Sequence, residues 1–333
     1  MIAPADLAAC KAAIRTGSLS FHAASKLLPA RVRDPSLALY AFCRLADDAV
    51  DDGDDKAAAV LHLRDRLDLV YAGRPRNAAA DRAFAAVVAD FDMPRALPDA
   101  LLEGLAWDAV GRQYDDLSGV LSYSARVAAA VGAMMCVLMR VRDADALARA
   151  CDLGLAMQLT NISRDVGEDA RAGRLFLPHD WLRAAGVEPA AFLANPTPSP
   201  AIRQVTARLL AEADKHYQRA EAGVGALPMG CRPGIFAARH IYAGIGTRVA
   251  AHGYDSITRR ASTGKWRKVG WLGLAFARSA VTLALPQSSV LHARVVPEVA
   301  FLVQAARSKA VPARSDSLLS VLAQLEARDR GMA

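Results

Sequence analysis

The sequence has few aromatic residues, few cysteines and no nucleotide-binding motif. Of its 333 residues, 53% are hydrophobic but only 6% are aromatic, so the core must be built mainly from Ala, Leu and Val. The five cysteines are scattered without a CxxC pair, which is typical of reduced thiols in a cytoplasmic protein and excludes a disulfide framework. No Walker loop is present, and no GxGxxG follows a strand, so neither ATP nor NAD binding is indicated.

Alternating strand patterns and hairpin signals are also missing. The Ala-rich composition favours helices, and we therefore predict an all-α fold. The N-terminus carries Asp6 and no apolar segment, so we expect no secretory signal there. The most apolar stretch, residues 269–286, contains Arg278 and several hydroxyl residues. This favours a buried or membrane-surface helix over a membrane span.

The formal net charge is +7, which fits an anionic substrate, an anionic membrane surface or nucleic acid. The basic residues are dispersed along the chain, and no basic stripe with interleaved aromatics is present. We therefore predict no nucleic-acid partner.

Apolar periodicity and helix breakers predict a series of helices. Their expected ranges are 35–52, 56–71, 81–91, 98–114, 121–140, 144–169, 201–222, 234–252 and 266–285. The breakers between them are short, and two acidic clusters lie on either side of any midpoint division. We therefore predict one helical domain over residues 1–286, followed by a partly helical C-terminal tail over residues 287–333.

The first acidic cluster is DDAVDD at residues 47–52. Asp47 and Asp51 would share one helix face, where like charges four residues apart repel each other. A solvated acidic turn and a cation site both remain open for this cluster alone. A calcium loop is excluded, because Val50 and Ala59 stand where that loop needs side-chain oxygens.

The second cluster lies at the end of an otherwise apolar helix. Asn161, Asp165 and Asp169 would share one face, with Arg164 and Glu168 between them. An exposed helix end is the alternative. Two sets of hard oxygen ligands favour Mg²⁺ or Mn²⁺, and Mg²⁺ completes its shell with water and substrate phosphates. The pair of clusters therefore indicates an enzyme that handles diphosphates.

Two further features remain ambiguous from the residues alone. Arg44 and Arg164 adjoin the clusters, where each could grip a diphosphate or serve as a structural partner of an acid. The small-residue stretch from Ala128 to Met134 could pack closely against a neighbouring helix or leave a tunnel for an isoprenoid chain.

Two long segments resemble the signatures of the squalene/phytoene synthase family of head-to-head prenyl transferases, in particular its bacterial carotenoid-type members. They are YAFCRLADDAVDD at residues 40–52 and QLTNISRDVGEDARAGRLFLP at residues 158–178, with supporting matches at residues 16–29, 123–135 and 240–262. The resemblance covers residues 17–268. It implies a single-domain isoprenoid-synthase-type helix bundle around a central cavity.

The resemblance also implies an activity. We expect two geranylgeranyl diphosphates to condense head to head, through prephytoene diphosphate, to phytoene in carotenoid biosynthesis. The alternative is a squalene or dehydrosqualene synthase that acts on farnesyl diphosphate. A hypothesis of another class is a non-catalytic helical scaffold that docks on membranes.

The roles that the resemblance implies fall into three groups. The expected ligands of Mg²⁺ (or Mn²⁺) are Asp47, Asp51, Asn161 and Asp165. The expected catalytic acids are Asp47, Asp48, Asp51, Asp165 and Asp169. The expected substrate contacts are Ser18, Ser20, Phe21, Tyr40, Arg44, Gln158, Arg164, Tyr242, Arg260 and Lys265.

The expected products are long hydrocarbons that must leave into lipid. We therefore expect a cytoplasmic protein, peripheral on the inner membrane, with other carotenoid enzymes as partners. The expected membrane contact comprises Lys265, Trp266, Arg267, Lys268 and Trp271. A buried helix preceded by a solvated basic turn is the alternative for this segment.

Overall fold

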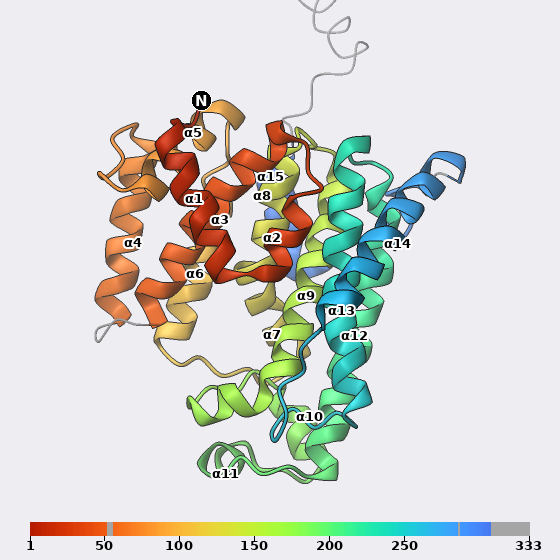
Figure 1. The fold of residues 1–333 in the computed structure, drawn as a ribbon. Helices are drawn as coiled ribbons and strands as arrows, with labels where there is room; N and C mark the ends of the chain where they lie inside the picture. The colour runs from red at the N-terminus through yellow and green to blue at the C-terminus, as the bar shows by residue number, and fades with distance from the viewer. Residues whose placement is uncertain (52–55, 286, 308–333) are drawn as a thin grey trace, which may run out of the picture.

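The computed structural model describes residues 1–51, 56–285 and 287–307 (Figure 1). Within these ranges, a few side chains lie outside the description: those of Leu19, Asp47, residues 49–51, Ala57, Lys265, Trp266 and Lys268. Every regular element in the described ranges is helical, which confirms the predicted all-α fold.

The helices follow one another with short connections. In chain order they are α1 (Pro4–Gly17), α2 (Leu19–Ser25), α3 (Ala30–Asp51), α4 (Lys56–Tyr71), α5 (Ala79–Phe91), α6 (Ala96–Ala109), α7 (Leu117–Ser124), the π-helix η1 (Ala125–Ala129), α8 (Ala130–Leu138), α9 (Ala144–Arg171), α10 (His179–Ala184), α11 (Pro189–Ala194), α12 (Pro200–Val224), the 3₁₀ turn η2 (Met229–Cys231), α13 (Arg232–Ala251), α14 (Lys265–Ala284), the 3₁₀ turn η3 (Pro297–Val299) and α15 (Ala300–Ala306).

Side-chain caps fix where the two longest central helices begin. The Asp143 carboxylate accepts a hydrogen bond of 2.8 Å from the backbone N–H of Ala146 at the start of α9. The Ser199 hydroxyl caps α12 in the same way, and Pro200 occupies the first turn. These signals are local, so the predicted starts lie within one residue of the observed ones.

Helix α3 differs from its prediction. Pro35 does not open this helix, because the helix begins at Ala30 and Pro35 lies inside it. Proline removes one intrahelical donor. In that turn the Ser36 hydroxyl donates a hydrogen bond of 2.7 Å to the carbonyl of Arg33. This side-chain bond supplements the backbone hydrogen bonds that proline interrupts. The helix therefore presents a longer face than the sequence pattern predicts.

Helix α9 lies at the centre of the bundle and packs against α7, α8, α12 and α13 (Figure 1). Glycines let α8 and α9 approach closely. A Cβ atom on Gly154 would lie 2.5 Å from the Cα of Ala129, and one on Gly132 would lie 2.6 Å from the carbonyl oxygen of Ala150. Larger residues there would force the two helices apart.

The segment Leu117–Leu138 is helical throughout, with η1 in its middle. Within the described ranges it is the segment long and apolar enough to cross a membrane, but 61% of its most apolar window is buried inside the protein. Ala129, Ala133 and Met134 are fully buried. This segment is therefore a core helix.

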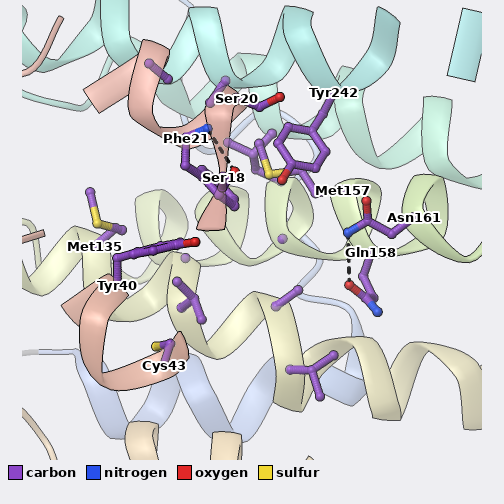
Figure 2. A pocket seen from close by; sticks show the side chains of 18 of the residues that line it. Ser18, Ser20, Phe21, Tyr40, Cys43, Met135, Met157, Gln158, Asn161 and Tyr242 are labelled. Atoms are coloured by element: carbon purple, nitrogen blue, oxygen red, sulfur yellow. Dashed lines mark hydrogen bonds between the residues drawn. The ribbon is translucent and has the colours of Figure 1, made fainter. Parts of the chain in front are cut away.

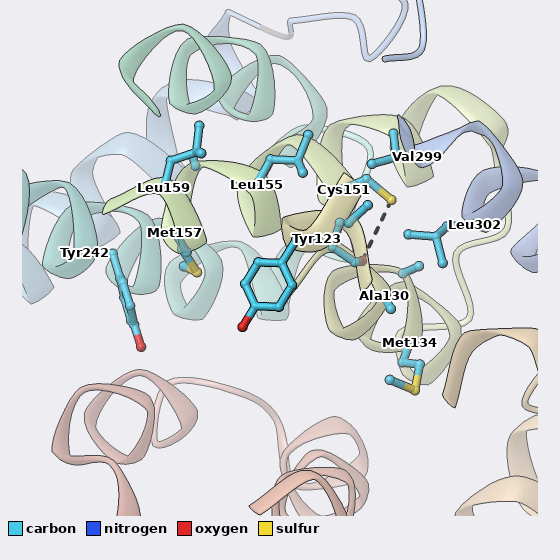
Figure 3. Packing of buried hydrophobic residues seen from close by; sticks show 14 of the residues in the cluster. Tyr123, Ala130, Met134, Cys151, Leu155, Met157, Leu159, Tyr242, Val299 and Leu302 are labelled. Atoms are coloured by element: carbon cyan, nitrogen blue, oxygen red, sulfur yellow. Dashed lines mark hydrogen bonds between the residues drawn. The ribbon is translucent and has the colours of Figure 1, made fainter. Parts of the chain in front are cut away.

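The C-terminal residues return to the body of the protein. Trp271 of α14 seats on Gly244 of α13, where an added Cβ would lie 2.1 Å from its Cη2 atom. Beyond α14, Val299 and Leu302 are buried beside Cys151 of α9 (Figure 3). The division at residue 286 stays a prediction, but part of the predicted tail belongs to the hydrophobic core.

Candidate active site

A cavity of about 850 Å³ lies between α9 and the helices α2, α3, α8, α12 and α13. On α9 its lining positions run from Ala146 to Asp169, which span about 35 Å at about 1.5 Å per residue. Figure 2 shows side chains from α2, α3, α9 and α13 converging on it.

One end of the cavity is charged and the rest is largely apolar. We define the charged end by the residues Arg44, Asn161, Arg164, Asp165, Glu168, Asp169, Arg174 and Arg260. A smaller hollow of about 210 Å³ adjoins this end and shares most of its lining. The arrangement is a long apolar chamber with a polar head.

The structure gathers most of the predicted site residues on this cavity. The lining includes Ser18, Ser20, Phe21, Tyr40, Arg44, Gln158, Asn161, Arg164, Asp165, Asp169, Tyr242 and Arg260. Asp48 is not among the lining residues, and its carboxylate pairs with Arg44 at 2.5 Å. The side chains of Asp47, Asp51 and Lys265 lie outside the described residues. Their roles, like those of the lining residues, stay predictions.

Arginines hold the central carboxylate of the charged end. Asp165 accepts a hydrogen bond of 2.8 Å from Arg260 Nε, and Arg164 approaches it with both Nε and Nη2. Arg260 also contacts Glu168 at 2.9 Å. The side chain of Arg260 is 59% exposed, so its bonds can exchange for a ligand at small cost.

The two partly buried aspartates of this end differ in pKa. Burial raises the pKa of Asp165, but hydrogen bonds from Arg164 and Arg260 outweigh it, and the net pKa is lowered. Burial raises the pKa of Asp169 to about 6. Arg174, 3.4 Å away, opposes that rise, and the charges of Asp165 and Glu168 add to it. Asp169 is therefore the acid of this end whose negative charge is least stabilised by an arginine.

The donor set of α9 suits a hard divalent cation. Asn161, Asp165 and Asp169 present only oxygen ligands of the type that Mg²⁺ and Mn²⁺ accept, and all three line the cavity. The raised pKa of Asp169 fits the same interpretation, since a bound cation would stabilise its ionised form. No group of three or more His, Cys, Asp or Glu arranged for a metal occurs among the described side chains, which exclude Asp47 and Asp51.

Aromatic side chains cover the cavity near α2. The Ser18 hydroxyl accepts a hydrogen bond from the backbone N–H of Phe21 at 3.2 Å and begins this helix. The ring of Phe21 lies 5.2 Å from that of Tyr242 and 6.4 Å from that of Tyr40 (Figure 2). Burial raises the pKa of Tyr242 to about 12, so this phenol is a neutral hydrogen-bonding group at neutral pH.

The small-residue stretch from Ala128 to Met134 both packs against a neighbouring helix and lines the cavity. Ala129 and Ala133 are fully buried in the core, and Ala129 meets Gly154 of α9. Ala128 and Gly132 line the cavity instead. One face of this helix packs closely, while the neighbouring face leaves room for a ligand.

Sequence reasoning missed three polar residues of the cavity. Tyr123 donates a hydrogen bond of 2.8 Å to Asp108, and both line the charged region together with Arg174. Asp108 and Tyr123 come from α6 and α7, away from the signatures on α3 and α9, although Tyr123 begins the supporting match at residues 123–135. Arg174 lies within the second signature, which could have identified it.

The helical bundle and its charged cavity define a protein of the isoprenoid-synthase type. The chain belongs to the squalene/phytoene synthase family, whose model matches residues 14–267. This confirms the resemblance.

Two relatives within the family are similar to the chain over nearly its whole length. The chain is 67% identical to the phytoene synthase of Cereibacter sphaeroides, an alignment that covers 99% of this chain and 96% of that protein. It is 65% identical to the phytoene synthase of Rhodobacter capsulatus, with 100% and 99% covered.

Among solved structures, a dehydrosqualene synthase in complex with a ligand superimposes with a TM-score of 0.76 at 30% identity, which covers 83% of this chain and 97% of that one. The squalene synthase of Alicyclobacillus acidocaldarius has a TM-score of 0.69 at 22% identity, covering 75% and 95%, and shows the fold alone. The predicted fold class is thus confirmed.

Proposed function

We propose that the protein is a 15-cis-phytoene synthase, a prenyl transferase that condenses two geranylgeranyl diphosphates head to head and releases diphosphate. The observation that carries this is the long apolar cavity with arginines and acids at one end. Relatives named phytoene synthase, 65–67% identical over essentially the whole chain, support the same product.

The residues of the charged end would bind the diphosphate groups. Arg164 and Arg260 now hold Asp165, and can turn their donors to diphosphate oxygens when substrate enters. Asn161, Asp165 and Asp169, with Asp47 and Asp51 of the first signature, would hold Mg²⁺ or Mn²⁺. When bound, such an ion stabilises negative charge on the leaving diphosphate.

The apolar body of the cavity would protect the reacting carbons. Loss of diphosphate from one substrate leaves an allylic cation, which the double bond of the second substrate captures; loss of a proton gives prephytoene diphosphate. A second loss of diphosphate, rearrangement and loss of a proton give phytoene. Water would quench these cations, and the aliphatic lining, which includes Leu153, Met157 and Ile245, excludes it.

Product analysis tests this proposal against its alternative. The purified protein is incubated with Mg²⁺ and either C15 or C20 prenyl diphosphate, with and without NADPH, and the hydrocarbons are identified by mass. We expect a C40 product from the C20 substrate without NADPH, and none when a chelator is present. The alternative rests on the dehydrosqualene synthase neighbour. A C30 hydrocarbon as main product would establish it.

We also propose a peripheral membrane contact through α14, because the product must leave into lipid. Its outer face exposes large apolar side chains: Val269, Leu274, Phe276, Val281 and Leu283 are 44–58% exposed. Arg267 is exposed beside them. Since Trp271 packs on Gly244, it contributes less to this surface than its sequence position suggests.

Flotation with anionic and neutral liposomes tests this contact. We expect binding to anionic liposomes that weakens with salt and falls in a Phe276→Ser, Leu283→Ser variant. Absence of binding at low salt would refute it. The location at the inner membrane and contact with other carotenoid enzymes stay predictions.

A further inference from the structure

The far end of the cavity contains a buried charge. There, the lining comprises Met139 after α8 and Ala146, Arg149 and Ala150 on α9. Arg149 is only 1% exposed. A buried guanidinium beside a largely apolar chamber is costly, so its surroundings must hold it in place.

Three groups fix this guanidinium. Its Nε donates to Asp152 Oδ2 at 2.8 Å, and its Nη1 donates to the carbonyl oxygens of Leu291, at 3.1 Å, and His292. Its Nη2 is buried with no hydrogen-bond partner in the described residues. On α12, a Cβ at Gly223 would lie 2.3 Å from the Cβ of Arg149, so the side chain has no room to move in that direction.

Asp152 is the shared anchor of this network. Its Oδ1 accepts hydrogen bonds of 2.9 Å from both Arg219 Nε and His216 Nδ1. Arg219 then donates from Nη2 to the carbonyl of Arg294 at 2.6 Å. Asp152 itself is completely buried.

Both arginines thereby hold the C-terminal strap, which we define as residues 287–296. Two kinds of contact hold it. Its first half is held through backbone carbonyls, since Val290 and Leu291 are each 54% exposed. Its second half also packs Val295 and Val296, both partly buried, against the core, and α15 follows them there. Arg149 therefore lies between the cavity and a strap whose outer side chains face solvent.

We propose that Arg149 is a specificity-determining residue that ends the hydrocarbon chamber and sets the longest prenyl chain the enzyme accepts. A longer chain would have to displace a buried guanidinium from a carboxylate and two carbonyls, or leave its terminal carbons against the charge. An apolar side chain of similar length would yield to the substrate instead. The inference rests on the proposed function, because it assigns the apolar chamber to prenyl tails.

Arg219 provides a matched control. It contacts the same carboxylate and the same strap as Arg149, but it does not line the cavity. Arg149→Met removes bonds to the carboxylate and two carbonyls, and Arg219→Met removes bonds to the carboxylate and one carbonyl. The two variants differ chiefly in that only Arg149 lines the cavity. Arg149→Lys keeps a charge at the chamber end in a side chain of about the length of Met. In all three, Asp152 retains at least two basic partners among Arg149, His216 and Arg219.

The measurement is kcat/KM for C20 and C25 all-trans prenyl diphosphates, with product mass and melting temperature for each variant. We expect Arg149→Met to raise the C25-to-C20 ratio at least about tenfold, the smallest usual effect of adding or removing apolar groups in a pocket. Arg149→Lys and Arg219→Met should keep the wild-type ratio, although Arg219→Met loses thermal stability.

Other results would show whether the inference on Arg149 or the proposed function is wrong. An unchanged ratio in folded Arg149→Met would overturn the inference, as would equal shifts in Arg149→Met and Arg219→Met. If Arg149→Met does not fold, Arg149→Gln, which keeps a donor for the Leu291 carbonyl, gives the same test with the same criteria. A wild-type protein that forms no condensed product from the C20 substrate would refute the proposed function itself.

Discussion

The two ends of the cavity use the same residue types for different purposes. At the charged end, Asp165 pairs with Arg164 and with Arg260, whose side chain is 59% exposed. At the far end, Asp152 and Arg149 are 0% and 1% exposed. Exposed pairs contribute roughly 0–1 kcal/mol, whereas breaking a buried pair costs about 3–5 kcal/mol.

The pKa values of the aspartates also differ between the two ends. The pKa of Asp152 is lowered, because hydrogen bonds from His216 and Arg219 outweigh the effect of its burial. Burial raises the pKa of Asp169, whose arginine partner is 3.4 Å away. At the far end three basic side chains hold the buried carboxylate of Asp152, while at the charged end the carboxylate of Asp169 is held by one arginine at 3.4 Å. The first arrangement is suited to holding a shape and the second to binding and releasing ligands.

The largest loss of stability should come from removing the buried carboxylate at the far end of the cavity. Asp152→Ala leaves Arg149 buried without its carboxylate, and we expect the free energy of unfolding to fall by about 3–5 kcal/mol. Urea titration followed by circular dichroism measures this loss. Asp68→Ala, which removes one exposed partner of Arg95, is the control and should change stability by less than about 1 kcal/mol. Equal midpoints for the two variants would show that burial does not distinguish the ends.

The second effect concerns activity at the charged end. The double variant Asp47→Ala, Asp165→Ala should lose at least about 10²-fold in turnover, because it removes two acids that, as proposed, would hold the divalent cation at the leaving diphosphate. Steady-state phytoene formation gives the number, with Asp68→Ala again as control. Retention of wild-type turnover would favour the non-catalytic scaffold.

The smallest effect tests exposure alone. The bidentate pair of Arg44 and Asp48 is 44% exposed on both sides. Asp48→Ala should therefore change the free energy of unfolding by less than about 1 kcal/mol, and added salt should reduce that difference further. A loss as large as that of Asp152→Ala would mean that geometry, and not burial, sets the strength of these pairs.

Local signals made much of the fold predictable. Helix α4 has the predicted limits, since Gly73-Arg-Pro follows directly, and the face of α9 that carries Asn161 and Asp165 follows from four-residue spacing. The start of α3 was not predictable from Pro35, because tertiary packing can outweigh the preference of proline for a helix start.

The rest of the site depends on which helices meet. Asp108 and Tyr123 join the cavity only because α6 packs against η1 and α8, and α7 packs beside α9. Asp152 did carry a local signal that the sequence analysis left unused. Asp152 lies in the apolar stretch ACDLGLAMQL, three residues after Arg149, which indicates a buried pair.

The strap and α15 have a consequence for how the chain can be shortened. The family model ends at residue 267, but Val299 and Leu302 complete the packing around α9 from beyond that limit. A protein cut at residue 286 would retain every signature residue. Its Arg149 and Arg219 would nevertheless lose the carbonyl oxygens that accept their hydrogen bonds. The hydrophobic core therefore extends beyond the stretch by which the family is recognised, and we expect a chain cut at residue 286 to be less stable.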